Sequence, residues 1–261
     1  LPDDDWKLLF IKDDFKDYYV EYYQRLKKLR LIGKISVDKM IVLSRLLGAI
    51  QSDGHLSKRG LRCYRCRFHL GEKEDTEEIK RDIEYLGFYV SSINRRTTNF
   101  TEKDTKKIIH YTCYYVSAEP CLGLLLHRLG GTTGRKTCQN KQLKDWLKKA
   151  PSSVKRAFLS GYQGGDGSKI SVNYKLPQQQ VIIKETKMST SHEYEASNMK
   201  YMEDIAQLFK DLGIKATIRN YKAKDLRRRL ILLCPSVEQE NLLKYSELID
   251  YSYCNEKRRK S

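Results

Sequence analysis

The sequence LLGAIQSDG at positions 46–54 and the sequence LSGYQGGDG at positions 159–167 decide the fold. In each stretch a glycine is followed five residues later by Asp-Gly. Each stretch also ends an apolar run with helical periodicity, at 40–50 in the first case and at 154–162 in the second. The two stretches therefore predict two helices that both end in Asp-Gly.

The segments that follow these two stretches match each other as well, which indicates an internal duplication over most of the chain. Each half is predicted to run helix–strand–strand–helix–strand–strand–helix, so the expected fold class is α+β, with two pseudo-symmetric αββαββα halves. The matching predicted elements are a helix at 74–86 and 199–212, a strand at 88–94 and 215–220, a strand at 109–117 and 229–233, and a helix at 121–129 and 237–248.

Residues 1–38 have no counterpart before the second motif and predict a helical extension, ahead of a first half at 39–150 and a second half at 151–261. Aromatic and apolar side chains recur in this extension at helical spacing. The pattern is typical of an amphipathic helix docked on the body, and the alternative is a base-stacking platform. These side chains are Phe15, Tyr18, Tyr19, Tyr22, Tyr23 and Leu26.

The charge of the chain points to a polyanionic partner. The 261 residues include 50 Lys and Arg against 33 Asp and Glu, which gives a formal net charge of +17. Nucleic acid is the first candidate partner and an anionic membrane surface the second. No stretch approaches the ~18 apolar residues that a membrane span needs, and the first residues do not form a secretory signal.

The cysteines predict a reducing, intracellular compartment and not secretion. There are seven of them, an odd number without regular spacing, so a disulfide framework is not expected. Cys63 and Cys66 form one CxxC pair, but no second pair follows at the spacing of a zinc site.

Basic residues gather on predicted strands and hairpins of both halves. In the strand-like segment 61–70, basic side chains alternate with Tyr64, Cys66 and Phe68, which gives one apolar and one basic face. The alternative for this basic face is a solvated strand face. Basic hairpins at similar places in both halves suggest two lobes that grip one duplex. The candidate DNA-binding residues are Arg62, Arg65, Arg67, His69, Arg95, Arg96, Lys222, Lys224, Arg227 and Arg229.

The position of the two motif acids needs a physical explanation, because the C-terminal end of a helix carries partial negative charge and disfavours a carboxylate. Gly48 with Ser52, and Gly161 with Gly165, form stripes of small residues where two helix backbones could approach closely. If these stripes pack together, Asp53 and Asp166 lie side by side. A divalent cation that prefers oxygen ligands, Mg²⁺ by default, would relieve their repulsion.

In these features the chain resembles the LAGLIDADG homing endonucleases in their two-motif, single-chain form, and the intein-encoded members most closely. Positions 46–54 keep the Gly, the Ile and the final Asp-Gly, and positions 159–167 keep the Leu, the Gly and the final Asp-Gly. Lys141 matches a lysine that precedes the second motif in intein-encoded members, although Lys144 stands where proline is usual. Gln51 and Gly164 stand at the sixth motif position, which is often Asp.

The resemblance implies that the motif helices form the interface between the halves and that two four-stranded sheets form a saddle along DNA. Asp53 and Asp166, together with Ser52 and Gly165, would hold two or three Mg²⁺ ions. Lys141 and a lysine near the end of the second half would assist catalysis. That second lysine is expected to be Lys257, with Lys244 as the alternative. The product would be a double-strand break with 3′ overhangs at a long asymmetric site, made by a monomer.

Two other functions stay open beside this one. A non-cleaving nucleic-acid-binding protein on the same fold could be an RNA splicing maturase, a DNA-binding regulator or a decayed endonuclease, but such a protein has no need for two acids near phosphates. A basic α/β protein with two capped helix ends would not explain the duplication. The chain is expected to lack splicing activity, and it could be free-standing, intron-encoded or cut from an intein.

Overall fold

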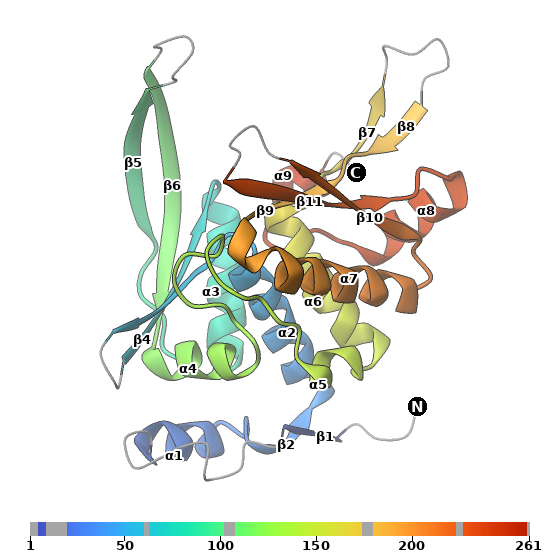
Figure 1. Ribbon diagram of the computed structural model, residues 1–261. Coiled ribbons are helices and arrows are strands. Elements are labelled where there is room, and N and C mark those ends of the chain that lie inside the picture. The colour runs from blue at the N-terminus through green and yellow to red at the C-terminus, as the bar shows by residue number, and fades with distance from the viewer. Residues whose placement is uncertain are drawn as a thin grey trace.

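The computed structural model describes residues 5–8, 20–59, 63–101, 108–173, 180–222 and 227–259. The fold is α+β, with two helix-and-sheet halves on either side of a central pair of helices (Figure 1). This is the predicted fold class. None of the helices in these ranges is long and apolar enough to cross a membrane.

The central pair consists of α2 (Val37–Gln51) and α6 (Ser152–Asp166), which contain the two sequence motifs. Their backbones approach at the glycines, since a Cβ at Gly48 would overlap the carbonyl oxygen of Phe158 and a Cβ at Gly161 would overlap that of Arg45. Only glycine permits this distance. Both helices are longer than their periodic apolar runs. The helix α2 begins earlier, at Val37 after the N-cap Ser36, and α6 continues through the buried Gln163 to Asp166.

The first half contains one four-stranded antiparallel sheet in the order β3-β4-β6-β5. Helices α3 and α4 cover the face of this sheet that carries the buried Tyr64, Cys66 and Phe68. The elements are β3 (His55–Arg59), β4 (Cys63–Leu70), α3 (Lys73–Tyr85), β5 (Asn94–Thr101), β6 (Ile108–Ala118) and α4 (Pro120–Arg128).

The second half repeats this order with a broken strand. The four-stranded sheet expected for this half is wrong: its sheet has three strands in the order β10-β11-β9, and β7 and β8 form a separate two-stranded sheet. Residues 184–185 interrupt the strand that would correspond to β4. The elements are β7 (Ile170–Asn173), β8 (Gln180–Ile183), β9 (Thr186–Ser191), the 3₁₀ turn η3 (His192–Tyr194), α7 (Glu195–Asp211), β10 (Ala216–Lys222), β11 (Arg228–Pro235) and α8 (Gln239–Leu248).

One predicted strand is wrong. Residues 88–93 pair only through an isolated bridge between Val90 and Ala118, and β5 begins at Asn94. Phe88 and Val90 are buried, so their alternation with exposed residues imitates a strand without a ladder of hydrogen bonds.

The extension before α2 contains β1 (Asp5–Leu8), α1 (Val20–Lys28) and β2 (Gly33–Ser36), of which β1 and β2 pair. Leu26 of α1 is fully buried, which fits an amphipathic helix docked on the body. Phe15, Tyr18 and Tyr19 lie outside the described residues. Two short helices complete the fold, α5 (Asp145–Lys148) before the second motif and α9 (Asn255–Arg258) after α8.

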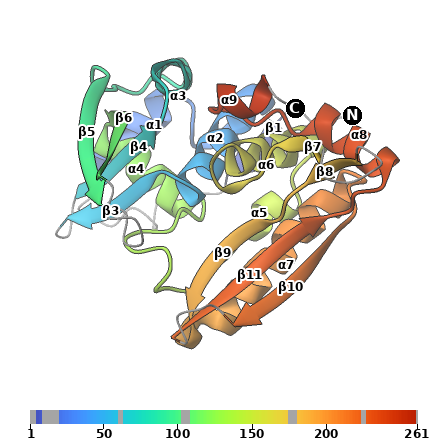
Figure 2. The same ribbon diagram turned by 90° about the horizontal axis from the view of Figure 1, so that it is seen from above.

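Seen from above, the two sheets lie on opposite sides of the α2–α6 pair (Figure 2). One continuous apolar core runs through both halves and includes Leu43, Leu46, Phe158 and Tyr162 from the central helices. The ends of α2 and α6 therefore lie between the two sheets, and this arrangement positions the candidate site.

Candidate active site

Asp53 and Asp166 lie beside each other at the adjoining ends of α2 and α6. A Cβ at Gly165 would lie 2.7 Å from Oδ2 of Asp53, so the Asp53 carboxylate rests against the last turn of α6. Asp53 is exposed and Asp166 is half-buried. Burial and then the charge of Asp53 raise the pKa of Asp166 to about 6, against the opposing effect of three lysines. The two carboxylates thus repel each other at short range.

Lys257 donates hydrogen bonds from Nζ to three carbonyl oxygens at the end of α6, those of Gln163 (3.0 Å), Gly164 (2.6 Å) and Gly165 (2.8 Å). An ammonium group is favoured there because the last carbonyls of a helix carry partial negative charge. Burial lowers the pKa of Lys257, while the charges of Asp53 and Asp166 oppose that effect.

Lys136 makes the matching contact in the other motif, because its Nζ donates to the carbonyl oxygen of Ser52 at the end of α2. Burial lowers the pKa of Lys136 to about 8. Lys136 was not among the residues predicted from the sequence, although the sequence contains a signal for it. Lys136 and Lys257 follow the equivalent helices α4 and α8 at nearly the same distance, since α4 ends at Arg128 and α8 ends at Leu248.

Lys141 lies in the same region without a symmetric counterpart. Its side chain is buried, with Nζ 5.5 Å from the centre of the Tyr201 ring, and burial lowers its pKa while the charge of Asp166 raises it. The other candidate for a second-half lysine, Lys244, pairs with Glu240 on the exposed surface of α8 at 2.8 Å. The structure therefore brings three lysines to the paired acids: Lys136, Lys141 and Lys257.

Ser52 and Gly165 support the site mainly through their backbones. The hydroxyl of Ser52 donates to the carbonyl oxygens of Gly48 (3.3 Å) and Ala49 (3.2 Å), within its own helix. The carbonyl oxygens of Ser52 and Gly165 accept from Lys136 and Lys257. In the described residues no group of three or more His, Cys, Asp or Glu side chains is placed to hold a metal ion. A cation here would rely on two carboxylates completed by phosphate or water oxygens.

The sixth motif position differs between the two halves. Gln51 is buried and holds the loop after α4, since its Nε2 donates to the Gly130 carbonyl (2.7 Å) and its Oε1 accepts from the Thr132 hydroxyl (2.8 Å). At the equivalent Gly164, the backbone of Ser252 occupies the space that a side chain would need. Both variants bring the segment with the lysine to the end of its motif helix.

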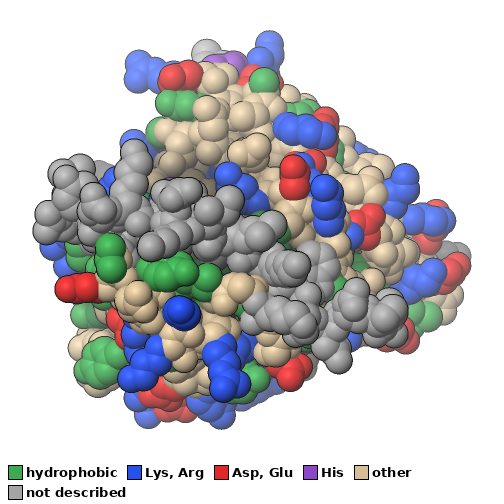
Figure 3. All heavy atoms as spheres, turned by 90° about the horizontal axis from the view of Figure 1, so that it is seen from below, with side chains coloured by type: hydrophobic (Ala, Val, Ile, Leu, Met, Phe, Trp, Pro, Cys, Tyr) green, Lys and Arg blue, Asp and Glu red, His purple; other side chains and the backbone are tan. Residues whose placement is uncertain are grey.

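The face of the first sheet that points away from α3 and α4 is basic. Strand register places Arg65, Arg67 and His69 of β4 on it, next to Arg96 of β5 and His55 of β3. Burial and the neighbouring cations lower the pKa of both histidines. No Asp or Glu occurs among the described strand residues of this face. By contrast, Figure 3, which views the molecule from below, shows acidic and basic side chains interspersed on the coloured surface.

One of the described basic residues selected from the first half does not join this face. Arg95 points to the opposite face from Arg96, because successive strand residues alternate. Arg62 lies outside the described residues. Arg59 joins the basic face through its pairing with Cys63, which the sequence analysis did not foresee.

In the second sheet, too, the strand register places the basic residues on two different faces. Arg229 and Lys222 pair with each other on the helix-covered face, and Arg229 Nε donates to Glu195 at the start of α7 (3.0 Å). The opposite face instead carries Arg219, Arg228 and Lys187. Arg227 is exposed in the turn before β11, and Lys224 lies outside the described residues. A dense basic run does not reveal which of its members share a face.

No family model matches the chain. It is similar to two curated tRNA-splicing ligases RtcB. It is 28% identical over 250 residues to the ligase of Methanopyrus kandleri, and the match covers 95% of this chain and 24% of the relative. It is 30% identical over 228 residues to the ligase of Pyrococcus furiosus, and the match covers 85% of this chain and 22% of the relative. It is also 27% identical over 239 residues to the replication factor C small subunit of Methanocaldococcus jannaschii, covering 90% of this chain and 12% of the relative. The chain thus spans a quarter or less of the length of these relatives.

Among solved structures, the chain is similar to the homing endonuclease I-WcaI bound to its DNA recognition sequence, with a TM-score of 0.53. The alignment covers 85% of each chain at 14% sequence identity. This likeness shows that the two chains share a fold.

Proposed function

We propose that this chain is a LAGLIDADG homing endonuclease domain that cuts both strands of a specific DNA site with the help of divalent cations. The observation that carries the proposal is the pair formed by Asp53 and Asp166, which lie together at the carbonyl ends of two helices packed backbone to backbone. Two acids in such an unfavourable place fit a site for cations better than they fit a structural role.

The donor set suits a hard cation such as Mg²⁺. Two carboxylates stand side by side, and the raised pKa of Asp166 reflects a repulsion that a divalent cation would remove. Asp53 and Asp166 would hold the cations, with Ser52 and Gly165 shaping the site. When bound, the cations would stabilise negative charge on the scissile phosphate and acidify the attacking water.

The lysines supply further positive charge for a phosphate. Lys136 and Lys257 occupy equivalent places at the ends of the two motif helices, so we assign them as the symmetric pair, with Lys141 as a third lysine beside Asp166. Because the pKa of Lys136 is about 8, its Nζ can accept or release a proton near neutral pH. Each ammonium group would stabilise charge that develops on the phosphate.

The uncovered faces of the two sheets would bind the duplex on either side of the acids. The first presents Arg65, Arg67 and His69, and the second presents Arg219 and Arg228. Such residues read base edges or neutralise phosphates, and a base-specific contact is worth about 1–3 kcal/mol. One site with two lobes in one chain fits a monomer on an asymmetric target.

The comparisons support an origin as a separate module within larger proteins. The names of the curated relatives describe unrelated proteins, a tRNA-splicing ligase and a subunit of replication factor C, yet nearly the whole of this chain matches a minor part of each. An intein-encoded endonuclease would occur in this way, as a segment shared by unrelated host proteins. We therefore favour DNA, and not a tRNA substrate, as the target of this chain.

The test is cleavage of a DNA library with randomised targets in the presence of Mg²⁺, followed by sequencing of the new ends. We expect one family of ends with 3′ overhangs, and none with EDTA or with the Asp53→Asn/Asp166→Asn double variant. If no Mg²⁺-dependent ends form while the chain still binds DNA, the chain is a non-cleaving binder on the same fold.

A further inference from the structure

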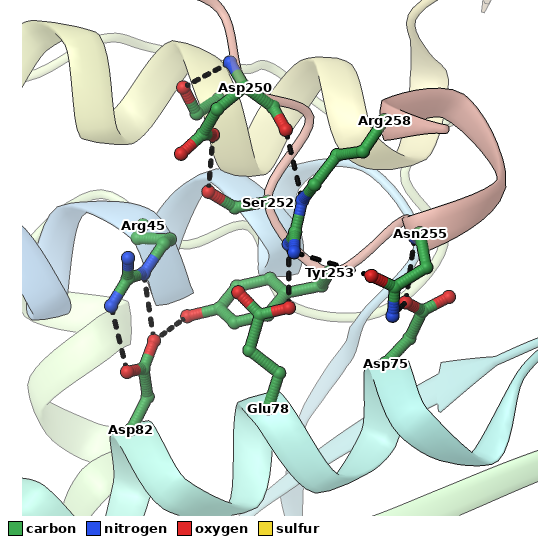
Figure 4. A network of polar contacts seen from close by, with 10 residues as sticks. Arg45, Asp75, Glu78, Asp82, Asp250, Ser252, Tyr253, Asn255 and Arg258 are labelled. Atoms are coloured by element: carbon green, nitrogen blue, oxygen red, sulfur yellow. Dashed lines mark hydrogen bonds and ion pairs between the residues drawn. The ribbon is translucent and has the colours of Figure 1, made fainter. Parts of the chain in front are cut away.

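Residues 249–259, here called the 249–259 segment, run from α8 of the second half across α3 of the first half (Figure 4). Tyr251 and Tyr253 adopt left-handed backbone angles, with φ of 49° and 62°, and both side chains are buried. Left-handed angles are uncommon for residues other than glycine, so strong contacts must hold this path.

Helix α3 supplies these contacts through three acidic residues. One oxygen of the buried Asp75 accepts from both the backbone N–H (2.8 Å) and the side-chain amide (2.7 Å) of Asn255. Glu78 pairs with Arg258 at 2.6 Å. Asp82 accepts from the hydroxyl of Tyr253 and is itself held by Arg45 of α2, with both oxygens bonded at 2.8 Å. These acids lie along one face of α3.

The other side of the 249–259 segment faces the candidate active site. Lys257 lies between Asn255 and Arg258, which are both bound to α3, and its Nζ reaches the end of α6. The backbone of Ser252 passes directly over Gly164, and the hydroxyl of Tyr251 donates to the Ser168 carbonyl (2.8 Å). A long, flexible lysine side chain reaches a fixed point only if its backbone is fixed as well.

We propose that Asp75, Glu78 and Asp82 of the first half are positioning residues for Lys257 of the second half. The proposal rests on the function proposed above. Helix α3 holds the 249–259 segment so that the Lys257 ammonium stays at the end of α6, beside the paired acids. One consequence is that the lysine of the second half takes its place only when the first half is correctly docked against it.

Asp75→Ala tests the proposal, with Glu77→Ala as the matched control, because Glu77 lies on the same helix and pairs with Lys73 at the surface. We expect Asp75→Ala to slow single-turnover cleavage by about 10- to 100-fold, as loss of a supporting contact does. Target affinity in Ca²⁺ should stay within about 2-fold, since Asp75 touches no basic sheet face. Asp75→Asn should keep most of the rate, because its amide oxygen still accepts from Asn255.

A double variant separates positioning from a general effect on stability. If Asp75 acts through Lys257, Asp75→Ala/Lys257→Met should cut no more slowly than Lys257→Met alone. If the two substitutions instead reduce the cleavage rate by factors that multiply in the double variant, the proposal is overturned.

Hydrogen–deuterium exchange of the free protein provides a readout that does not depend on cleavage. Asp75→Ala should speed exchange in residues 249–259, and Glu77→Ala should not. Unchanged exchange in Asp75→Ala would overturn the positioning role even if cleavage slowed. If the unmodified chain cuts no DNA at all, the proposed function fails, while exchange still decides whether α3 holds the segment.

Discussion

Lys136 and Lys257 make equivalent contacts with the ends of the two motif helices, but the segments that carry them are held differently. The first-half loop is bound by a side chain of its own half, that of Gln51, through Gly130 and Thr132. In the second half, Gly164 at this position leaves room for the Ser252 backbone, and Ser160 of α6 only accepts from the backbone N–H of Asp250 (3.4 Å). The 249–259 segment is held in addition by acids of the opposite half, which bind Asn255 and Arg258. A duplicated fold has thus kept the place of the lysine and changed its support.

The opposite half also contributes to the first-half segment, further along the chain. Asn198 of α7 is fully buried, accepts from the backbone N–H of Lys141 (3.0 Å) and donates to the carbonyl of Gln139 (3.3 Å). Helices α3 and α7 therefore each hold a segment of the other half. The two halves thus assemble one candidate site together and do not carry two independent sites.

Removing the charge of either paired acid should reduce cleavage equally, whichever half the acid belongs to. We expect Asp53→Asn and Asp166→Asn each to lower double-strand cleavage on the order of 10³-fold, because each removes charge that holds the cations. DNA affinity should be kept or rise, since a negative charge near phosphates is lost. Cleavage of each strand, measured with separately labelled strands, checks this. One variant that still cuts a strand at the normal rate would show that the halves work independently.

Substitutions at the sixth motif position should change the free energy of unfolding by different amounts in the two halves. We expect Gly164→Ala to lower the free energy of unfolding by about 3 kcal/mol, because the new Cβ overlaps the Ser252 carbonyl of a backbone that cannot easily move. Gln51→Ala should lower it by about 1–2 kcal/mol, the effect of two lost buried hydrogen bonds. Denaturant unfolding of both variants measures the difference. A larger effect at Gln51 would mean that the side chain, and not the close backbone, is the stronger support.

The sequence predicted the duplication, the α+β class and most helices, because apolar periodicity and Leu-Gly helix ends are local signals. Gly87 and Gly213 indeed have left-handed angles just after α3 and α7. The sequence could not reveal that residues 184–185 break a strand, since that depends on how β8 leaves the sheet. It also did not distinguish Lys136 from other lysines, because only the packed helix ends show which ammonium groups reach a carbonyl.

Strand register limited the prediction of the DNA-binding residues, and it supplies a test. Arg67 lies on the uncovered face, with its guanidinium 5.6 Å from the Tyr115 ring, whereas Arg229 faces α7 and pairs with Glu195. We expect Arg67→Ala to weaken target binding by about 1–3 kcal/mol and Arg229→Ala to leave it nearly unchanged. Binding titrations at two salt concentrations check both variants. Equal losses would show that the helix-covered face also meets DNA.

The smallest expected effect concerns the repulsion between the two halves at Asp166. Because folding raises the pKa of Asp166 from 3.8 to about 6, the folded chain keeps a proton that the unfolded chain has lost between those pH values. The contribution of this group to the free energy of unfolding therefore falls as pH rises from about 4 to about 6. In EDTA at pH 7.5, Asp166→Asn should be more stable than the unmodified chain by about 1 kcal/mol, discounted for its half-exposed site.

This gain should vanish below about pH 4, where the carboxyl group of Asp166 is protonated in both states. It should also shrink when Mg²⁺ is added, because a bound cation stabilises the unmodified chain and not the variant. Denaturant unfolding at both pH values, with Glu77→Gln as a surface control, measures the effect. A gain that persists at low pH would have a cause other than charge. A gain unaffected by Mg²⁺ would mean that the two acids repel each other without holding a cation. The presence of one acid in each half would then not be explained by metal binding.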